Sequence, residues 1–184
     1  MLEELRKYIT LTEDKEEKLV ADPLPYGTGD LAPVLSKDNV DYHYNVLTKG
    51  YVNRFNKGEG DPKFNYGGAK LHNLFWTQLQ PPKTPNRPKG SIKEFIDKHH
   101  EDYDNFKKEM LKVAMGLQGS GWVYLAKNGD IKTTPNQSYK TDILFPIDMW
   151  EHSFMDYVPA KDAKKKYIEN MMKIINWDVI NGRL

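Results

Sequence analysis

Residues 145–154, FPIDMWEHSF, place Asp148 and His152 four residues apart, with a tryptophan between them. Carboxylate oxygens and imidazole nitrogens are common ligands of first-row metal ions, so the pair has the chemistry of a metal site. The same D-x-x-x-H spacing also arises often by chance. Taken alone, it is consistent with a surface carboxylate next to an unrelated histidine.

The other four histidines fall into two settings. His99 and His100 lie in the polar stretch DKHHEDYD, which predicts solvated residues near a helix junction, and no role is assigned to them. His43 and His72 each lie on the apolar face of a predicted helix. Taken singly, each is more typical of a core histidine satisfied by a hydrogen bond than of a metal ligand.

Together, His43, His72, Asp148 and His152 could supply three imidazoles and one carboxylate to a single site inside the protein. This donor set suits a redox-capable ion such as manganese or iron, because it mixes borderline nitrogen with hard oxygen and leaves a position open. Zinc accepts the same donors, so the chemistry of the side chains does not fix the metal.

Two predicted helices carry the first two of these histidines. Residues 36–56 have Ser36 as an N-cap, and their apolar residues recur at three- and four-residue steps. The buried stripe predicted for this helix comprises Val40, His43, Tyr44, Leu47, Tyr51 and Phe55. Glycines and a proline in residues 56–68 predict a turn. The second helix, over residues 69–79, has an apolar face made of His72, Phe75, Trp76 and Leu79.

The remaining residues predict helices around a small antiparallel sheet. Residues 91–117 divide into two helices, and the inner face of the second comprises Phe106, Met110, Val113 and Leu117. Asn128-Gly129 is a strong hairpin signal between two extended runs, and residues 142–148 predict a further strand. A last helix is predicted over residues 161–180. Its buried side comprises Ile168, Met171, Met172 and Ile175.

The predicted fold class is α+β, with an N-terminal α-helical hairpin lobe and a C-terminal α/β lobe that contains the small antiparallel sheet. A charged N-terminal extension is expected over residues 1–22 and the helical hairpin domain over residues 23–80. Residues 81–90 are rich in proline and lack an apolar period, which is typical of a stiff linker. The C-terminal α/β domain is expected over residues 91–184.

Composition argues against several other classes of protein. The 184 residues include no cysteine, which removes disulfides, thiolate metal sites and cysteine nucleophiles. The formal net charge of +1 provides no basic field for nucleic acid. No apolar run approaches the roughly 20 residues of a membrane-spanning helix, and the N-terminus shows neither a signal nor a transit pattern. A soluble, cytoplasmic protein that binds neither nucleic acid nor membranes is expected.

Several stretches resemble, in order and context, the iron/manganese superoxide dismutases: LPYGTGDLAP, HYNVLTKGYVNRFN, GGAKLHNLFW, QGSGWVYL, TTPNQ, IDMWEH and IINWD. The similarity covers roughly residues 23–180, and D-x-W-E-H with its upstream motifs is specific as a set. The resemblance implies a two-lobed fold with one manganese or iron ion per subunit between the lobes. It implies conversion of superoxide to oxygen and hydrogen peroxide by redox cycling of that ion. The ligands implied are His43, His72, Asp148 and His152.

The resemblance also implies roles for residues around the ligands. Tyr51 matches the tyrosine at the mouth of the substrate funnel, and Gln137 matches the glutamine that bonds the coordinated water in manganese-type enzymes. Gly68 stands where iron-type enzymes usually place their glutamine, so the arrangement is manganese-like, with iron as a close second.

The same likeness extends to the surroundings of the site. The aromatic wall around the metal is matched by Trp76, Trp122 and Trp150, although ordinary core packing explains these residues nearly as well. Glu151 matches the glutamate that bonds across the subunit interface to a ligand histidine of the other subunit, which implies a homodimer.

Two departures from the family pattern affect its proton relay. The usual gateway histidine is Leu47, and the tyrosine that partners it across the interface is Met155. Both halves of a polar pair are thus apolar, which avoids leaving one half unpaired. Slower turnover or altered product inhibition is expected. Two alternatives stay open: a non-catalytic structural or interaction protein that retains the fold, and an iron oxygenase, which needs only two histidines and one carboxylate.

Overall fold

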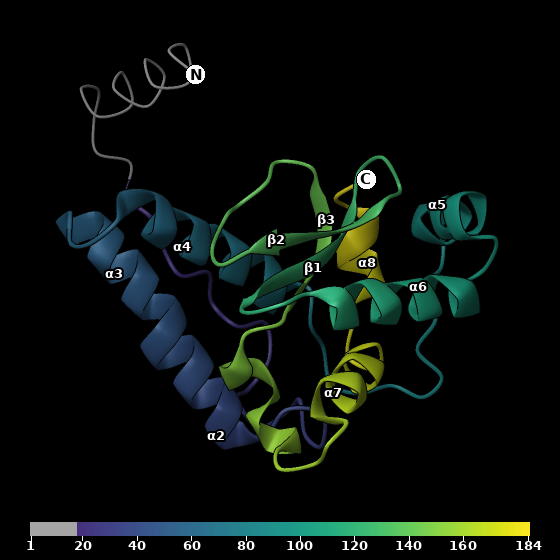
Figure 1. Cartoon of the computed structure of the whole chain (residues 1–184), viewed down its shortest axis with the longest axis horizontal. Coiled ribbons are helices and arrows are strands. Elements are labelled where there is room, and N and C mark those ends of the chain that lie inside the picture. The colour runs from purple at the N-terminus through teal and green to yellow at the C-terminus, as the bar shows by residue number, and fades with distance from the viewer. Residues whose placement is uncertain (1–17) are drawn as a thin grey trace.

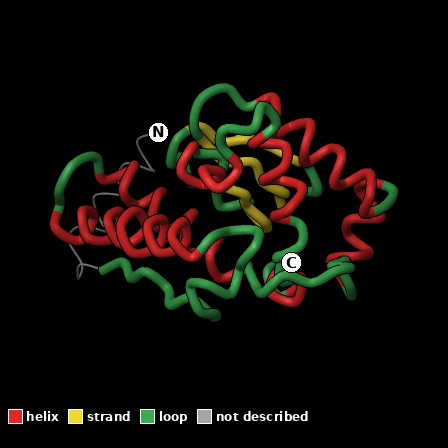
Figure 2. The backbone as a smooth tube through the Cα atoms, turned by 90° about the horizontal axis from the view of Figure 1, so that it is seen from below, coloured by secondary structure: helices red, strands yellow, loops and turns green. Residues whose placement is uncertain are grey.

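The computed structural model describes residues 18–184, so most of the extension expected over residues 1–22 lies outside the described residues. In Figure 1 the helical hairpin lies to the left, the sheet in the centre, and α5 (Ser91–His100) and α6 (Tyr103–Gly116) to the right. Figure 2 shows the sheet and its surrounding helices from below. Among the described residues, no helix is long and apolar enough to cross a bilayer.

The first arm of the hairpin is a continuous helical run with a wide turn in its middle. It consists of α2 (Lys37–Val40), the π-helix η1 (Asp41–Thr48) and α3 (Lys49–Lys57). Ser36 caps the run as predicted, because its hydroxyl accepts a hydrogen bond from the backbone N–H of Asn39. The run ends at Gly58, whose φ of 69° lies in the left-handed region that favours glycine.

The π-helix changes which residues face the interior. Its backbone hydrogen bonds span five residues instead of four, so one extra residue enters the turn. Four residues of the predicted stripe are buried, namely Val40, His43, Tyr44 and Tyr51, whereas Leu47 and Phe55 are only half-buried. Thr48 and Val52, which lie outside the predicted stripe, are buried as well. After the wide turn the buried face therefore also includes the residues that directly follow Leu47 and Tyr51, which a regular helical period does not predict.

The second arm, α4 (Pro62–Thr77), begins earlier than the predicted start at residue 69. The Asp61 carboxylate caps it by accepting from Phe64 N at 2.9 Å. Pro62 suits the first helical position, where a backbone N–H has no helical partner. Gly67 and Gly68, which the sequence predicts to lie in a turn, are inside this helix.

The C-terminal lobe contains the predicted helix pair and sheet. The strands β1 (Gly121–Ala126), β2 (Ile131–Pro135) and β3 (Ile143–Asp148) are antiparallel, in the order β2-β1-β3. Both β1 and β3 are buried along their whole length, which explains their continuous apolar sequences. Helix α6 packs on β1 and β2, and α4 packs on β3. The α+β fold class, with a small antiparallel sheet, is confirmed.

The prediction of a single helix over residues 161–180 is wrong. The chain forms α7 (Ala163–Met171) and α8 (Trp177–Asn181), which follow the short 3-10 helix η2 (Glu151–Tyr157). The backbone between α7 and α8 is hydrogen-bonded to residues 78–83, since Gln80 N donates to Ile174 O and Asn176 N donates to Gln78 O. These long-range hydrogen bonds outweigh the helical pattern. The four predicted apolar residues are nevertheless buried.

The prediction of a solvated His100 is also wrong. His100 is buried, its Nδ1 lies 2.6 Å from Glu109 Oε2, and its Nε2–H donates to Gly129 O at 2.9 Å. It therefore ties α5 and α6 to the β1–β2 hairpin. His99 is exposed, as expected.

One large apolar core extends through both predicted lobes, so Trp76 and Leu79 share it with residues of β1 and β3. Residues 81–90 form no helix or strand. The domain boundaries at residues 22, 80 and 90 remain predictions.

Candidate metal centre

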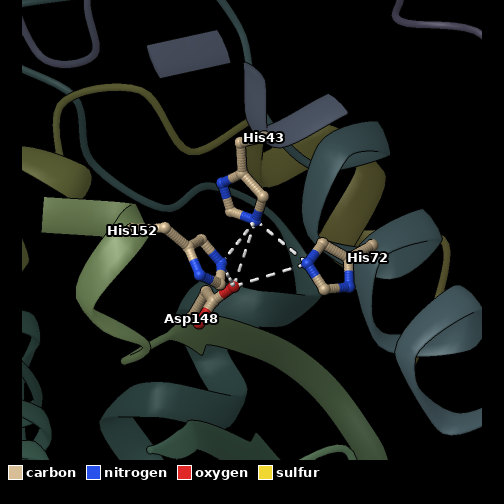
Figure 3. Close-up of side chains that lie close together, drawn as sticks. All are labelled: His43, His72, Asp148 and His152. Carbon is tan, nitrogen blue, oxygen red and sulfur yellow. Dashed lines mark hydrogen bonds and ion pairs between the residues drawn. The ribbon is translucent and has the colours of Figure 1, made fainter. Parts of the chain in front are cut away.

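Four side chains from four different elements meet at one point (Figure 3). His43 lies on η1, His72 on α4, Asp148 at the end of β3 and His152 on η2. Each offers one ligand atom, and these four atoms lie within 4.8 Å of one another. Three of the residues are buried, and His152 is partly exposed.

Five of the six distances between these atoms are those expected around a single ion. His43 Nε2 lies 2.9 Å from His72 Nε2, and 3.2 Å from both His152 Nε2 and Asp148 Oδ2. The same carboxylate oxygen lies 3.3 Å from His152 Nε2 and 3.6 Å from His72 Nε2. Two ligand atoms that each lie about 2.1 Å from one ion are about 3.0 Å apart when the ligand–metal–ligand angle is about 90°. They are about 3.6 Å apart when this angle is about 120°. The cluster therefore suits one metal ion.

The protonation states of the cluster favour a cation. Burial lowers the pKa of His43, and burial together with the neighbouring His43 lowers the pKa of His72 to about 3. Burial alone would raise the pKa of Asp148, but hydrogen bonds from His152 and His43 hold it below the ordinary value of a carboxyl. Neutral imidazoles and an ionised carboxylate at neutral pH are the forms in which these groups bind metals.

Two of the four side chains are oriented by hydrogen bonds from their outer atoms. His72 Nδ1–H donates to Gly68 O at 2.6 Å, which fixes the tautomer that turns the Nε2 lone pair toward the cluster. Asp148 Oδ1 accepts from the backbone N–H of Trp150 at 2.8 Å, so Oδ2 faces the three imidazoles.

The segment that carries His152 is held by the first arm of the hairpin. Asn39 Nδ2 donates to His152 O at 3.1 Å. The backbone N–H and hydroxyl of Ser36 donate to the two oxygens of Asp156 at 2.8 and 2.7 Å. No local pattern in the sequence signals these contacts, because they join residues that are more than 100 positions apart.

A polar chain borders the cluster. Gln137 Nε2 donates to Tyr51 Oη at 3.1 Å, and Gln137 Oε1 accepts from Trp122 Nε1 at 3.1 Å. The rings of Tyr51 and Trp122 lie 5.2 and 5.0 Å from that of His72. Burial raises the pKa of Tyr51, although the hydrogen bond from Gln137 opposes this, so its hydroxyl is protonated at neutral pH.

Two glycines of α4 allow this chain to approach the helix closely. A Cβ at Gly67 would lie 1.7 Å from Gln137 O, and a Cβ at Gly68 would lie 2.6 Å from the Tyr51 ring. Both distances are below 3.0 Å, and real Cβ atoms essentially never make contacts this short. The absence of side chains at Gly67 and Gly68 therefore lets Gln137 and Tyr51 pack directly against the backbone of α4, and the two glycines do not break the helix.

The three predicted tryptophans all contact ligand candidates. Trp122 contacts His72, as described above, the ring of Trp76 lies 4.7 Å from that of His43, and Trp150 is stacked on His152 at 5.9 Å. Trp76 and Trp122 are fully buried, so they also belong to the core, in keeping with both interpretations of these residues.

The residues expected near a subunit interface lie at or near the surface. Glu151 is exposed and accepts a hydrogen bond from Ser120 Oγ at 3.1 Å. Leu47 is half-buried against a small apolar cluster that includes Tyr51, and Met155 is 56% exposed. Their roles across an interface remain predictions.

A buried cluster of three imidazoles and one carboxylate, placed between a helical hairpin and an α+β lobe, belongs to the class of metal sites that suit one redox-active ion. A family model described as iron/manganese superoxide dismutases, C-terminal domain, matches residues 88–183. With the relatives described next, this match shows that the chain belongs to the iron/manganese superoxide dismutase family.

Relatives whose names give manganese, iron or both are similar to this chain over most of their length. The iron superoxide dismutase of Bacteroides fragilis is 32% identical over 188 residues, covering 88% of this chain and 96% of the relative. The manganese/iron superoxide dismutase of Porphyromonas gingivalis is 31% identical, with coverages of 87% and 96%. The mitochondrial manganese superoxide dismutase of Glossina morsitans morsitans is 31% identical, with coverages of 87% and 86%.

Proposed function

We propose that this protein is a superoxide dismutase that converts two superoxide ions and two protons into one oxygen and one hydrogen peroxide, with one manganese or iron ion per subunit. The observation that carries the proposal is the convergence of His43, His72, Asp148 and His152 on one point from both parts of the chain. Full-length similarity to proteins named as superoxide dismutases supports it.

In this proposal the four side chains hold the ion through His Nε2 and Asp148 Oδ2. When bound, manganese or iron supplies the one-electron oxidation and reduction that the disproportionation of superoxide requires. Gln137 holds solvent at the site through its side-chain amide. Tyr51 Oη, which is kept protonated by burial, would supply a proton to the peroxide product.

Manganese is the favoured metal, with iron as a close second. Gln137, to which we assign the manganese-type role, is buried and donates to Tyr51 Oη, which supports this choice. At position 68 a side chain would meet the Tyr51 ring, so the iron-type glutamine has no room in this packing. The relatives include proteins named for manganese, for iron and for both.

We further propose a homodimer in which Glu151 bonds across the interface, supported by its exposed carboxylate adjacent to His152. With Leu47 and Met155 in place of a polar pair, slower turnover or altered product inhibition is expected. A cytoplasmic location remains a prediction from the sequence.

Two alternatives are less consistent with the site. A non-catalytic structural or interaction protein has no physical need for three imidazoles aimed at one carboxylate, since such a cluster is costly to bury without a cation. An iron oxygenase needs only two histidines and one carboxylate, and His152 would be a superfluous fourth donor.

The deciding experiment combines elemental analysis with a dismutase assay on one preparation. We expect about one manganese or iron ion per subunit and decay of pulse-generated superoxide faster than with free metal. A His43→Ala control should lose both. Protein that carries only trace metal and does not accelerate decay would favour the non-catalytic alternative, and oxygen uptake that depends on an organic cosubstrate would favour the oxygenase.

A further inference from the structure

Thr48 is a fully buried polar residue that no sequence motif singles out. It is the last residue of η1, and its hydroxyl donates to His43 O, five residues earlier, at 2.9 Å. The same oxygen accepts from Trp76 Nε1–H at 2.9 Å. An indole N–H can only donate and a carbonyl can only accept, so the direction of both bonds is fixed.

These bonds close a ring of contacts around His43. Trp76 is tied through Thr48 to the backbone of His43, and the indole ring packs edge-to-face against the His43 ring at 4.7 Å and 71°. A movement of the indole would therefore also move a surface that supports the imidazole. The π-turn makes this ring possible, because it brings residue 48 beneath the carbonyl of residue 43.

His43 depends on this packing more than His72 does. His72 is oriented by the hydrogen bond from its Nδ1–H to Gly68 O. Within residues 18–184, His43 Nδ1 is buried and forms no hydrogen bond. Apart from the contacts of its Nε2 with the other ligand candidates, the His43 ring is therefore oriented by the aromatic groups packed around it, of which Trp76 is held by Thr48.

We infer that Thr48 is a positioning residue for the metal centre, which fixes the His43 imidazole through the Trp76 indole. The inference rests on the proposed function only in assuming that His43 binds the ion. It predicts that the Thr48 hydroxyl, rather than the volume of its side chain, controls metal affinity.

The test compares Thr48→Val, which keeps the shape and removes the hydroxyl, with Thr48→Ser, which restores it. Thr77→Val is a matched control, because the Thr77 hydroxyl also donates to a helix carbonyl, Asn73 O, and accepts from a partly buried side-chain donor, Arg183. Mn(II) affinity of each metal-free protein is measured by competition with a chelator. The indole N–H signals of the same proteins are recorded by NMR.

We expect Thr48→Val to shift one indole N–H signal and to weaken Mn(II) binding by about 10- to 100-fold, the range for groups that orient metal ligands. Thr48→Ser and Thr77→Val should bind Mn(II) much as the wild type does. If Thr48→Val does not fold, the smaller hydroxyl-free variant Thr48→Ala takes its place in the same comparison.

Three results would overturn the inference. The first is an unchanged Mn(II) affinity in Thr48→Val despite a shifted indole signal. The second is equal weakening in Thr77→Val, which would indicate a general loss of stability, and the third is failure of Thr48→Ser to restore binding. A wild-type protein that binds neither manganese nor iron would instead reject the proposed function, and the role of Thr48 with it.

Discussion

Replacing Gly67 by alanine tests the close approach of α4 to the chain around Gln137. The added Cβ would stand 1.7 Å from Gln137 O and 2.9 Å from Gln137 C. Both atoms belong to the backbone, so no side-chain rotation relieves the overlap. Either α4 or the segment that carries Gln137 has to move.

The magnitude is the balance of two opposing effects. Overpacking of a tight interior destabilises by about 1–3 kcal/mol, and a backbone clash lies at the upper end of that range. Alanine is favoured over glycine inside a helix by about 1 kcal/mol. The free energy of unfolding of Gly67→Ala should therefore be about 2 kcal/mol lower than that of the wild type. This difference corresponds to a decrease in melting temperature of about 4–8 °C for a chain of this size.

The assay is thermal unfolding of the metal-free protein, with Gly116→Ala as the control. Gly116 is the last residue of α6, and a Cβ there would meet nothing within 4 Å. The control should melt at or above the wild-type temperature, because only helix propensity changes. A Gly67→Ala variant that is as stable as the wild type would refute the packing argument and would return Gly67 to the role of an ordinary helical residue.

Three further predictions concern acid stability, the C-terminus and the tyrosine. Because the pKa of His72 is lowered to about 3 from the ordinary histidine value of 6.5, the unfolded chain binds a proton that the native metal-free protein excludes between these values. Its stability should thus fall on acidification from about pH 6.5, by up to about 1.4 kcal/mol per pH unit, and flat urea midpoints between pH 7 and 5 would contradict this. Arg183 donates four hydrogen bonds to the end of α4 and to β3. Arg183→Met should therefore lower the free energy of unfolding, measured in urea, by about 2–3 kcal/mol. Tyr51→Phe removes the hydroxyl bonded to Gln137 and should slow superoxide decay with metal content unchanged; undiminished turnover would exclude Tyr51 Oη as a proton donor.

Much of the fold followed from local patterns. Ser36 and the apolar steps after it predicted the first helix, and Asn128-Gly129 predicted the β1–β2 hairpin, because caps and turns depend on a few neighbouring residues. Where the prediction was wrong, distant residues were responsible. Long-range hydrogen bonds to residues 78–83 separate α7 from α8. The close approach of Gln137 and Tyr51 explains why glycines occupy positions 67 and 68 inside α4.

The sequence by itself determined most of the elements, the family and the identity of four candidate ligands, because local patterns, donor types and motif order are properties of the chain. Only the tertiary structure decided that these donors stand 2.9–3.6 Å apart in the contacts between them, and that Thr48, Asn39 and the two glycines of α4 support them. Such distances arise from the packing of segments that are far apart in sequence, and no local period encodes them.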